Sequence, residues 1–312
     1  MIALTPTPVS GWQAFWQRFH LPLLQPLRVF PTLLIVHLLV SIPDTEILRV
    51  PLTLLAAAGL LFRSWLRTTA YWYVMATCLG TAIYFHWESA DNHRYLFAYA
   101  ALALCAACSL PRGEQAEGLA LSCRWLLGLA MALATTWKLC SPDYLDGTLF
   151  TSELLLDERF APLTTWLTEL TPQALLQNRE AARLLMTGHE LGLQLTSVHL
   201  TQSPGVTTLA HLLTWWTVGI EAALALLFLL PTPLLERCRL GGMKNGLLVL
   251  FGVTTYLVAP IRGFGGILML LGLAQCRPQQ QQAQYAYLLA FLAIQLFTLP
   301  LSAMLNWLLA IY

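Results

Sequence analysis

The sequence predicts an all-α protein: a polytopic transmembrane helical bundle with eight or nine spans and a long extracytoplasmic helical loop. Of its 312 residues, 57% are hydrophobic and only 11% are charged, whereas a soluble globular domain carries about 25% charged residues. The mean hydropathy of +0.62 points the same way. A chain of this composition cannot cover a hydrophobic core with polar surface, so lipid is the expected solvent for most of it.

Apolar segments separated by polar or Pro-containing turns give the expected spans, five within residues 29–139 and the rest within 206–312. The segments are Val29–Ile42, Val50–Phe62, Ala70–Trp87, Tyr95–Leu110, Leu119–Leu139, Val206–Leu230, Gly246–Ala259, Ile261–Ala274 and Tyr285–Ala310. Several are shorter than the ~20 residues that cross a bilayer. The two pieces beside Pro260 are either two short helices or one kinked helix, which leaves the count at eight or nine.

Charge placement predicts the orientation of the bundle. With the N-terminus in the cytoplasm, basic side chains gather on the inner side, as the positive-inside rule requires. They are Arg18, Arg28, Arg63, Arg67, Arg112, Arg237, Arg239, Lys244 and Arg277. Residues 1–28 form an N-terminal interfacial segment, in which Trp12–Leu24 has the pattern of an amphipathic helix on the membrane surface.

Residues 140–205 form the expected extracytoplasmic loop, which contains eight acids and three arginines. Its leucines recur at helix-like spacing, and Thr171-Pro172-Gln173 is typical of a helix start with Pro at the first position. One or two helices on the membrane surface would therefore cap a cavity between the spans.

Charge and cysteine usage exclude several classes of function. The net charge is +1 and no long basic run occurs, so nucleic acid is not an expected partner. The seven cysteines are scattered and odd in number, unlike the disulfide framework of a secreted protein. No spacing resembles a metal site, so no bound metal is expected.

Ionisable side chains within apolar spans are costly, and they are therefore the first candidates for function. Lys138 lies at the outer end of the fifth span. If desolvated, it is a usable general base, although its position alone favours a side chain that extends to the interface. His93 opens the fourth span on the same side, where both nitrogen groups can converge on one ligand. Taken alone, His93 is more typical of a solvated residue that follows an N-cap.

Three further positions have a structural and a functional interpretation. Glu221 lies well inside the sixth span and needs a partner, such as Arg262 or a threonine hydroxyl, unless it has a functional role. His37, in the middle of the first span, is explained most simply by a hydrogen bond between helices. Cys105-Ala106-Ala107-Cys108 places two sulfurs on one helical face, but its Ala/Leu surroundings favour two packed small residues over a redox pair.

Two local patterns together resemble a known family. Asn92-His93-Arg94-Tyr95-Leu96 resembles the Asn-His-x-Tyr-Leu that opens a membrane helix in vitamin K-dependent γ-carboxylases and the wider bacterial HTTM family. Trp137-Lys138-Leu139, followed by Tyr144-Leu145-Asp146-Gly147, is similar to the family's Lys-Leu…Trp-x-x-Gly segment. The resemblance covers about half of the chain, and the two motifs together are more specific than either alone.

This resemblance implies a multi-pass protein of a bacterial inner membrane that works on a reduced, vitamin K-like quinone. In the carboxylases, the lysine that matches Lys138 deprotonates reduced vitamin K, and the histidine that matches His93 supports the developing charge. The oxygenated quinone then removes a γ proton from a glutamate, to which carbon dioxide adds, in a cavity that must exclude water. The expected cofactor contacts are Trp137, Asn92, Tyr95 and Glu221.

The chain also departs from the family pattern. Tyr144 stands where a tryptophan is expected. The large lumenal region that holds the propeptide in the carboxylases has no counterpart in these residues, so the resemblance concerns the membrane core alone.

Three other functions remain open. The chain can be a non-catalytic scaffold or accessory subunit, packed against other membrane subunits, or a thiol oxidoreductase that uses Cys105 and Cys108. Transport ranks last, because the sequence has neither an inverted repeat nor a paired pattern of broken helices.

Overall fold

The computed structural model describes residues 25–41, 46–188, 197–238, 240–258 and 262–297. Throughout these ranges the regular elements are helices and no strand occurs, which confirms the all-α prediction. The expected interfacial helix Trp12–Leu24, the turn at Pro260 and the end of the last expected span, from residue 298, lie outside them.

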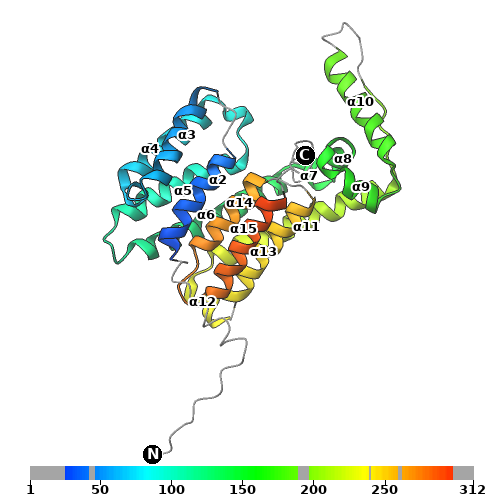
Figure 1. Cartoon of the computed structure of the whole chain (residues 1–312). Coiled ribbons are helices and arrows are strands. Elements are labelled where there is room, and N and C mark those ends of the chain that lie inside the picture. Colours follow the sequence, from blue (N-terminus) through cyan, green and yellow to red (C-terminus); the bar gives the residue numbers. More distant parts are fainter. Residues whose placement is uncertain (1–24, 42–45, 189–196, 239, 259–261, 298–312) are drawn as a thin grey trace, which may run out of the picture.

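Nine long helices occupy the apolar segments of the described chain (Figure 1). They are α2 (Pro26–Val40), α3 (Glu46–Leu61), α4 (Thr69–Phe85), α5 (Asn92–Ser109), α6 (Gln115–Cys140), α11 (Pro204–Leu229), α13 (Gly241–Val258), α14 (Arg262–Ala274) and α15 (Gln281–Phe297). Short helices lie at the turns: η1 (Trp65–Arg67), η2 (Trp87–Ser89) and α12 (Thr232–Arg237).

Residues that line two cavities show how the helices alternate in direction. At one end of the bundle, Leu39 near the end of α2 shares a cavity with His93 at the start of α5. At the other end, Pro26 at the start of α2 shares a cavity with Glu117 at the start of α6 and Gln275 just after α14. Each end of the bundle therefore collects helix starts and helix ends, as an up-and-down arrangement requires.

The pieces on either side of Pro260 are two separate antiparallel helices. Lys244 near the start of α13 donates a hydrogen bond to Gln275 just after the end of α14. Half-way along, Gly252 of α13 faces Met269 of α14 so closely that an added Cβ would lie 2.6 Å from its methyl carbon. Of the two arrangements that the sequence left open, the structure has the helical pair and not one kinked helix.

Helix α14 is the central element of the main core. Nearly every side chain along it is buried, from Gly263 to Ala274, because it packs against α2, α5, α6, α13 and α15. Two glycines bring its neighbours close: the ring of His37 lies against Gly266, and the ring of Tyr287 against Gly272. Small residues at such crossings are typical of helices packed in lipid.

The described residues of the 140–205 segment fold into a helical unit on the first half of α11. It contains α7 (Pro142–Leu145), α8 (Thr148–Leu156), η3 (Glu158–Phe160), α9 (Ala161–Leu167) and α10 (Pro172–Gly188), which extends away from the bundle (Figure 1). The expected helix start is confirmed, because α10 begins at Pro172 and the Thr171 hydroxyl accepts a hydrogen bond from the Ala174 amide. Leu154, Phe160 and Val206 belong to its separate hydrophobic core.

Two helices of the described chain, α6 and α11, are long and apolar enough to cross a membrane. Helices α2 and α14 and the stretch Leu48–Leu61 are apolar but shorter than that test requires. Length and composition therefore allow two crossings, and the span count of eight or nine stays a prediction.

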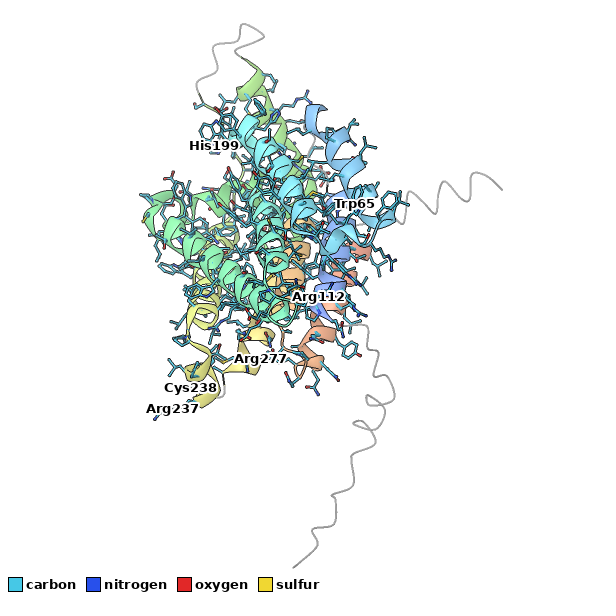
Figure 2. The ribbon with its side chains drawn as sticks, turned by 90° about the vertical axis from the view of Figure 1, so that its left-hand side faces the viewer. Trp65, Arg112, His199, Arg237, Cys238 and Arg277 are labelled. Carbon is cyan, nitrogen blue, oxygen red and sulfur yellow. The ribbon has the colours of Figure 1, made fainter. Side chains whose placement is uncertain are left out.

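Cationic side chains lie at both ends of the bundle. Arg112, Arg237 and Arg277 lie toward the end opposite His199 (Figure 2). The cavity that contains His93, at the other end, is lined by Arg49, Arg94 and Arg262, and the positive-inside pattern does not account for these three arginines. Orientation therefore stays a prediction as well.

Candidate functional site

Lys138 and Glu221 form an ion pair between α6 and α11. The Lys138 ammonium donates a hydrogen bond to Oε1 of Glu221, and the two side chains are 17% and 7% exposed. The partner of Glu221 is therefore Lys138. Arg262, which the sequence offered for this role, instead donates to the Val40 carbonyl at 3.3 Å. The pair lies well inside α11 but close to the end of α6, because α11 continues past α6 into the 140–205 unit.

A layer of polar groups covers this ion pair on the side of the 140–205 unit. The Lys138 ammonium lies 5.2 Å from the centroid of the Tyr144 ring, within the range of a cation–π contact. The Tyr144 hydroxyl is 2.6 Å from the hydroxyl of Thr217, and Thr214 donates to the Tyr144 carbonyl at 3.3 Å. These contacts hold α7 against α11 and place an aromatic face beside the ammonium.

Sequence reasoning misses two members of this layer. In the sequence Tyr144 stands out only as a departure from the family pattern, and Thr217 does not stand out at all. One signal is available for Thr217, because it lies four residues before Glu221 and therefore on the same face of α11. Tyr144 gives no local signal, since its position depends on how α7 folds back onto α11.

A tight turn positions Tyr144. Gly147, between α7 and α8, has a φ of 82°, a left-handed conformation that glycine adopts without strain. The side chain of Asp146 accepts a hydrogen bond from the Thr148 amide at 2.8 Å, closing the turn. A Cβ at Gly147 would also lie 3.1 Å from the His211 ring. The Asp146-Gly147 pair therefore has a local structural role.

The second carboxyl oxygen of Glu221 has no hydrogen-bond partner among the described residues. Oε2 is buried and makes no hydrogen bond in the described part of the chain. A buried carboxyl oxygen without a donor is costly, and such exceptions call for an explanation. A ligand hydroxyl or an amide that donates to Oε2 would supply what the protein does not.

An apolar groove lies between α6 and α11, and neither Lys138 nor Glu221 is among its lining residues. Its volume is about 450 Å³, and its lining includes Thr135 and Ala132 of α6 with Ala222 and Leu226 of α11. Ala222 directly follows Glu221 in the chain. The threonine hydroxyls of this stretch bond to their own helix, so the groove presents mainly carbon. It suits a hydrocarbon chain better than a polar solute.

His93 makes none of the contacts that hold the Lys138–Glu221 pair in the described part of the chain. Its ring packs against Gly263 at the start of α14, where an added Cβ would lie 2.6 Å from Cδ2. Its Nδ1 is 3.8 Å from a carboxyl oxygen of Asp91. Among the described residues, no hydrogen bond, ion pair or ring contact joins His93 to Lys138. The convergence of these two groups on one ligand stays a prediction that no contact supports.

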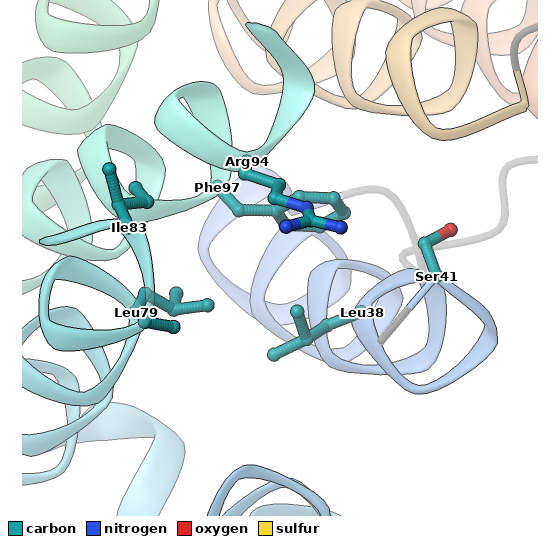
Figure 3. Close-up of a pocket in the computed structure, with 7 residues that line it drawn as sticks. Leu38, Ser41, Leu79, Ile83, Arg94 and Phe97 are labelled. Carbon is teal, nitrogen blue, oxygen red and sulfur yellow. The ribbon is translucent and has the colours of Figure 1, made fainter. Parts of the chain in front are cut away.

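The cavity beside His93 is polar and open. Its volume is about 660 Å³, and three arginines, Arg49, Arg94 and Arg262, line it together with Asp91. A small void of about 10 Å³ lies behind it, around Arg94 and Ser41, with Leu38, Ile83 and Phe97 as its apolar wall (Figure 3). The Arg94 Nε and the Ser41 hydroxyl are buried and have no hydrogen-bond partner in the described ranges, and the void is about the size that one bridging water needs.

The other residues expected to contact a cofactor make no contact with the Lys138–Glu221 pair among the interactions of the described residues. Asn92 is exposed and Tyr95 is half-buried on α5. Trp137 is 78% exposed and belongs to the outer surface of α6, whereas Lys138 points to α11. The structure therefore brings together two of the six expected site residues, Lys138 and Glu221.

His37 and the cysteine pair have structural environments. His37 is fully buried and its Nε2 lies 3.1 Å from the Gly263 carbonyl, which is the helix–helix hydrogen bond expected from the sequence. Cys105 and Cys108 are free thiols on α5, and the Cys105 sulfur donates to the Thr69 carbonyl at 3.6 Å. No group of three or more His, Cys, Asp or Glu side chains that could hold a metal occurs within the described ranges.

Comparison of the chain with protein-family models, with curated proteins and with solved structures finds no match. The resemblance to the HTTM family therefore stays an expectation that rests on two short motifs.

Proposed function

We propose that the chain is a multi-pass membrane protein whose Lys138–Glu221 pair takes up a proton from a lipid-soluble, quinol-like molecule. The observation that carries this proposal is the buried ion pair, in which one carboxyl oxygen has no partner among the described residues; the lining of an apolar groove between the same two helices includes Ala222, the residue after Glu221.

Exposed apolar surface supports the membrane part of the proposal. The core helix of a soluble protein can be as long and apolar as α6 or α11, but most of it is then buried. In the apolar windows of these two helices, only 33% and 44% of the residues are buried. Leu133, Trp137 and Leu226 are among the large side chains left exposed. Surface of this kind is stable when lipid covers it.

The geometry of the pair supports a different role for each side chain. Lys138 occupies Oε1 of Glu221 and stabilises the carboxylate by its charge. Oε2 is left to accept a hydrogen bond. A phenolic hydroxyl of the ligand donates to Oε2, and its proton then passes to the carboxylate, leaving a phenolate beside the Lys138 ammonium. The proton acceptor is thus Glu221, with Lys138 as the electrostatic partner, whereas the family resemblance assigned the base to Lys138.

The surroundings match the two parts of such a ligand. The aromatic face of Tyr144 and the hydroxyl of Thr217 lie on the polar side of the pair. The groove between α6 and α11 has room for the hydrocarbon tail of a quinol on the other side. His93 lies in a separate cavity, so the proposal does not use it.

The proposal is tested by measuring the affinity of the purified full chain for a reduced short-chain naphthoquinone. Quenching of tryptophan fluorescence reports the binding. Glu221→Gln removes the carboxylate, and the affinity is expected to fall about tenfold or more, since hydrogen bonds to charged groups contribute about 1.5–3 kcal/mol. The dimethyl ether of the same quinol, which lacks both hydroxyl protons, is expected to lose a similar factor with the unaltered protein.

Two controls separate binding from folding. Glu180→Gln removes the same charge from the exposed surface of α10 and is expected to leave quinol affinity unchanged. The double variant Lys138→Met/Glu221→Gln removes both charges, so it avoids the buried unpaired charge that either single change leaves. If the ether binds as tightly as the quinol, or Glu221→Gln binds normally, the proposal is wrong. Stoichiometric co-purification with other membrane subunits and no quinol binding would instead favour the scaffold hypothesis.

A further inference from the structure

A second cavity, at the opposite end of the bundle from His93, is rich in positive charge. It has a volume of about 420 Å³ and lies between the first turns of α6, helix α12, the start of α13 and the α14–α15 connection. Arg124, Lys244 and Arg277 line it, and Glu117 is the acid among its lining residues. No part of the site proposed above lies here.

Lys244 is the most unusual of these cations, because it is only 7% exposed. Its ammonium donates to Oε1 of Gln275 at 2.7 Å and lies 5.0 Å from the centroid of the Phe228 ring. Gln275 is held in turn by Asn245, which accepts from its Nε2 at 2.9 Å. The lysine is therefore positioned by a neutral, buried hydrogen-bond network.

Among the described residues, no carboxylate forms an ion pair with this ammonium. The cations that act on it are Arg124 and Arg277, whereas the Cys276 thiol acts in the opposite sense. Arg124 is fixed nearby, because its Nε donates to the Phe228 carbonyl at 2.8 Å. Burying the Lys244 ammonium near cations of like sign, without an ion-pair partner among the described residues, is unfavourable. An anion in the cavity would remove that cost.

We propose that this cavity is a binding site for a phosphate group. Three cations that face one space are the arrangement by which proteins hold phosphates. The start of α13, at Gly241 on the cavity wall, adds the positive end of a helix dipole. The volume is sufficient for a phosphate with a small organic substituent.

Two sources of the phosphate fit the chemistry. Leu121, Leu235 and Ala120 also line the cavity, so a headgroup with part of a glycerol backbone would find apolar contacts. If the chain lies in a membrane as proposed, this end of the bundle is at headgroup depth, and an anionic phospholipid can enter from the side. A free phosphorylated compound would enter from water.

Isothermal titration calorimetry on the purified full chain in a neutral detergent distinguishes these sources. One arm titrates inorganic phosphate, and the other compares short-chain phosphatidylglycerol with phosphatidylcholine of the same chain length. We expect at least one of inorganic phosphate and phosphatidylglycerol to bind. Preference for phosphatidylglycerol without phosphate binding identifies a lipid headgroup, and phosphate binding without a lipid preference identifies a soluble compound.

Variants of the lining residues test whether binding occurs in this cavity. Lys244→Gln and Arg277→Gln are each expected to weaken binding about tenfold or more. Arg63→Gln removes an equal charge from an exposed residue outside the cavity and should have no effect. If Lys244→Gln fails to fold, Arg277→Gln decides, because Arg277 is exposed. Absence of binding by both probes, or an equal loss in Arg63→Gln, overturns the proposal.

Discussion

Glu221 shows how a single residue can be identified from the sequence without its partner being known. A carboxyl group inside an apolar span must be protonated, paired or functional, and this alone makes Glu221 a candidate. Its partner lies 83 positions away in the chain. Lys138 and Arg262 lie at compatible depths in the expected spans, so the sequence does not choose between them. The packing of α6 against α11 makes Lys138 the partner.

The Asp157 carboxylate gives the 140–205 unit a pH-dependent contact. Its side chain accepts hydrogen bonds from the backbone amide and the guanidinium of Arg159. The Arg159 hydrogen bonds hold the pKa of Asp157 below its usual value. A carboxylate with a lowered pKa in the folded state contributes stability above its unfolded pKa of about 3.9. This contribution is lost as the pH falls through the folded pKa.

We therefore expect Asp157→Asn to increase hydrogen exchange in α8 and η3 at about pH 7. The difference from the unaltered protein should shrink as the pH falls through the lowered pKa of Asp157, because Asp157 itself then becomes protonated. Hydrogen–deuterium exchange by mass spectrometry, corrected for intrinsic rates, measures the increase at about pH 7 and its decrease at lower pH. A difference that stays constant over this pH range would show that the Arg159 contact does not stabilise the unit.

At the scale of the element, α14 is placed by its glycines. An added Cβ at Gly272 would lie 2.5 Å from a ring carbon of Tyr287, and one at Gly266 would lie 2.3 Å from the His37 ring. Both aromatic side chains are fully buried, so they cannot move aside. These glycines allow α15 and α2 to approach α14 more closely than larger residues would.

We expect Gly272→Ala to destabilise the protein by about 1–3 kcal/mol, the usual cost of overpacking a core. Gly80→Ala in α4 is the matched control, because nothing lies within 4 Å of an added Cβ there. That change should be neutral, or stabilising by about 0.4–1 kcal/mol, since alanine restricts the unfolded chain. Thermal unfolding in one detergent compares the two. Equal melting temperatures would contradict the close packing of α14 against α15.

At the scale of the whole molecule, the fold separates its polar sites along the bundle. Lys138 and Glu221 lie near the 140–205 unit, whereas Lys244 and its cavity lie at the opposite end. One exposed cysteine lies at each of these ends. Cys140 ends α6 beside the 140–205 unit, and Cys238 follows α12. Their accessibility can decide whether the chain crosses a membrane.

If the chain spans the membrane with its N-terminus inside, a membrane-impermeant maleimide should label Cys140 in intact cells and Cys238 only after permeabilisation. Cys140→Ser and Cys238→Ser assign each signal, because each removes one site. The other cysteines are buried or half-buried. Labelling of both cysteines from the same side without permeabilisation would contradict a crossing by α11.

The sequence by itself determined the helical class, the positions of the long helices and the helix start at Pro172, because composition, apolar periodicity and proline position act locally. It also singled out Lys138 and Glu221, since a charged residue within an apolar segment can be recognised without knowledge of the tertiary fold. The tertiary structure decided that these two pair, that His93 lines a cavity with three arginines, and that Lys244 lines one with two arginines. Such contacts join residues far apart in sequence, and they are set by which helices pack together, at what depth and in which direction. No periodicity within one helix contains that information.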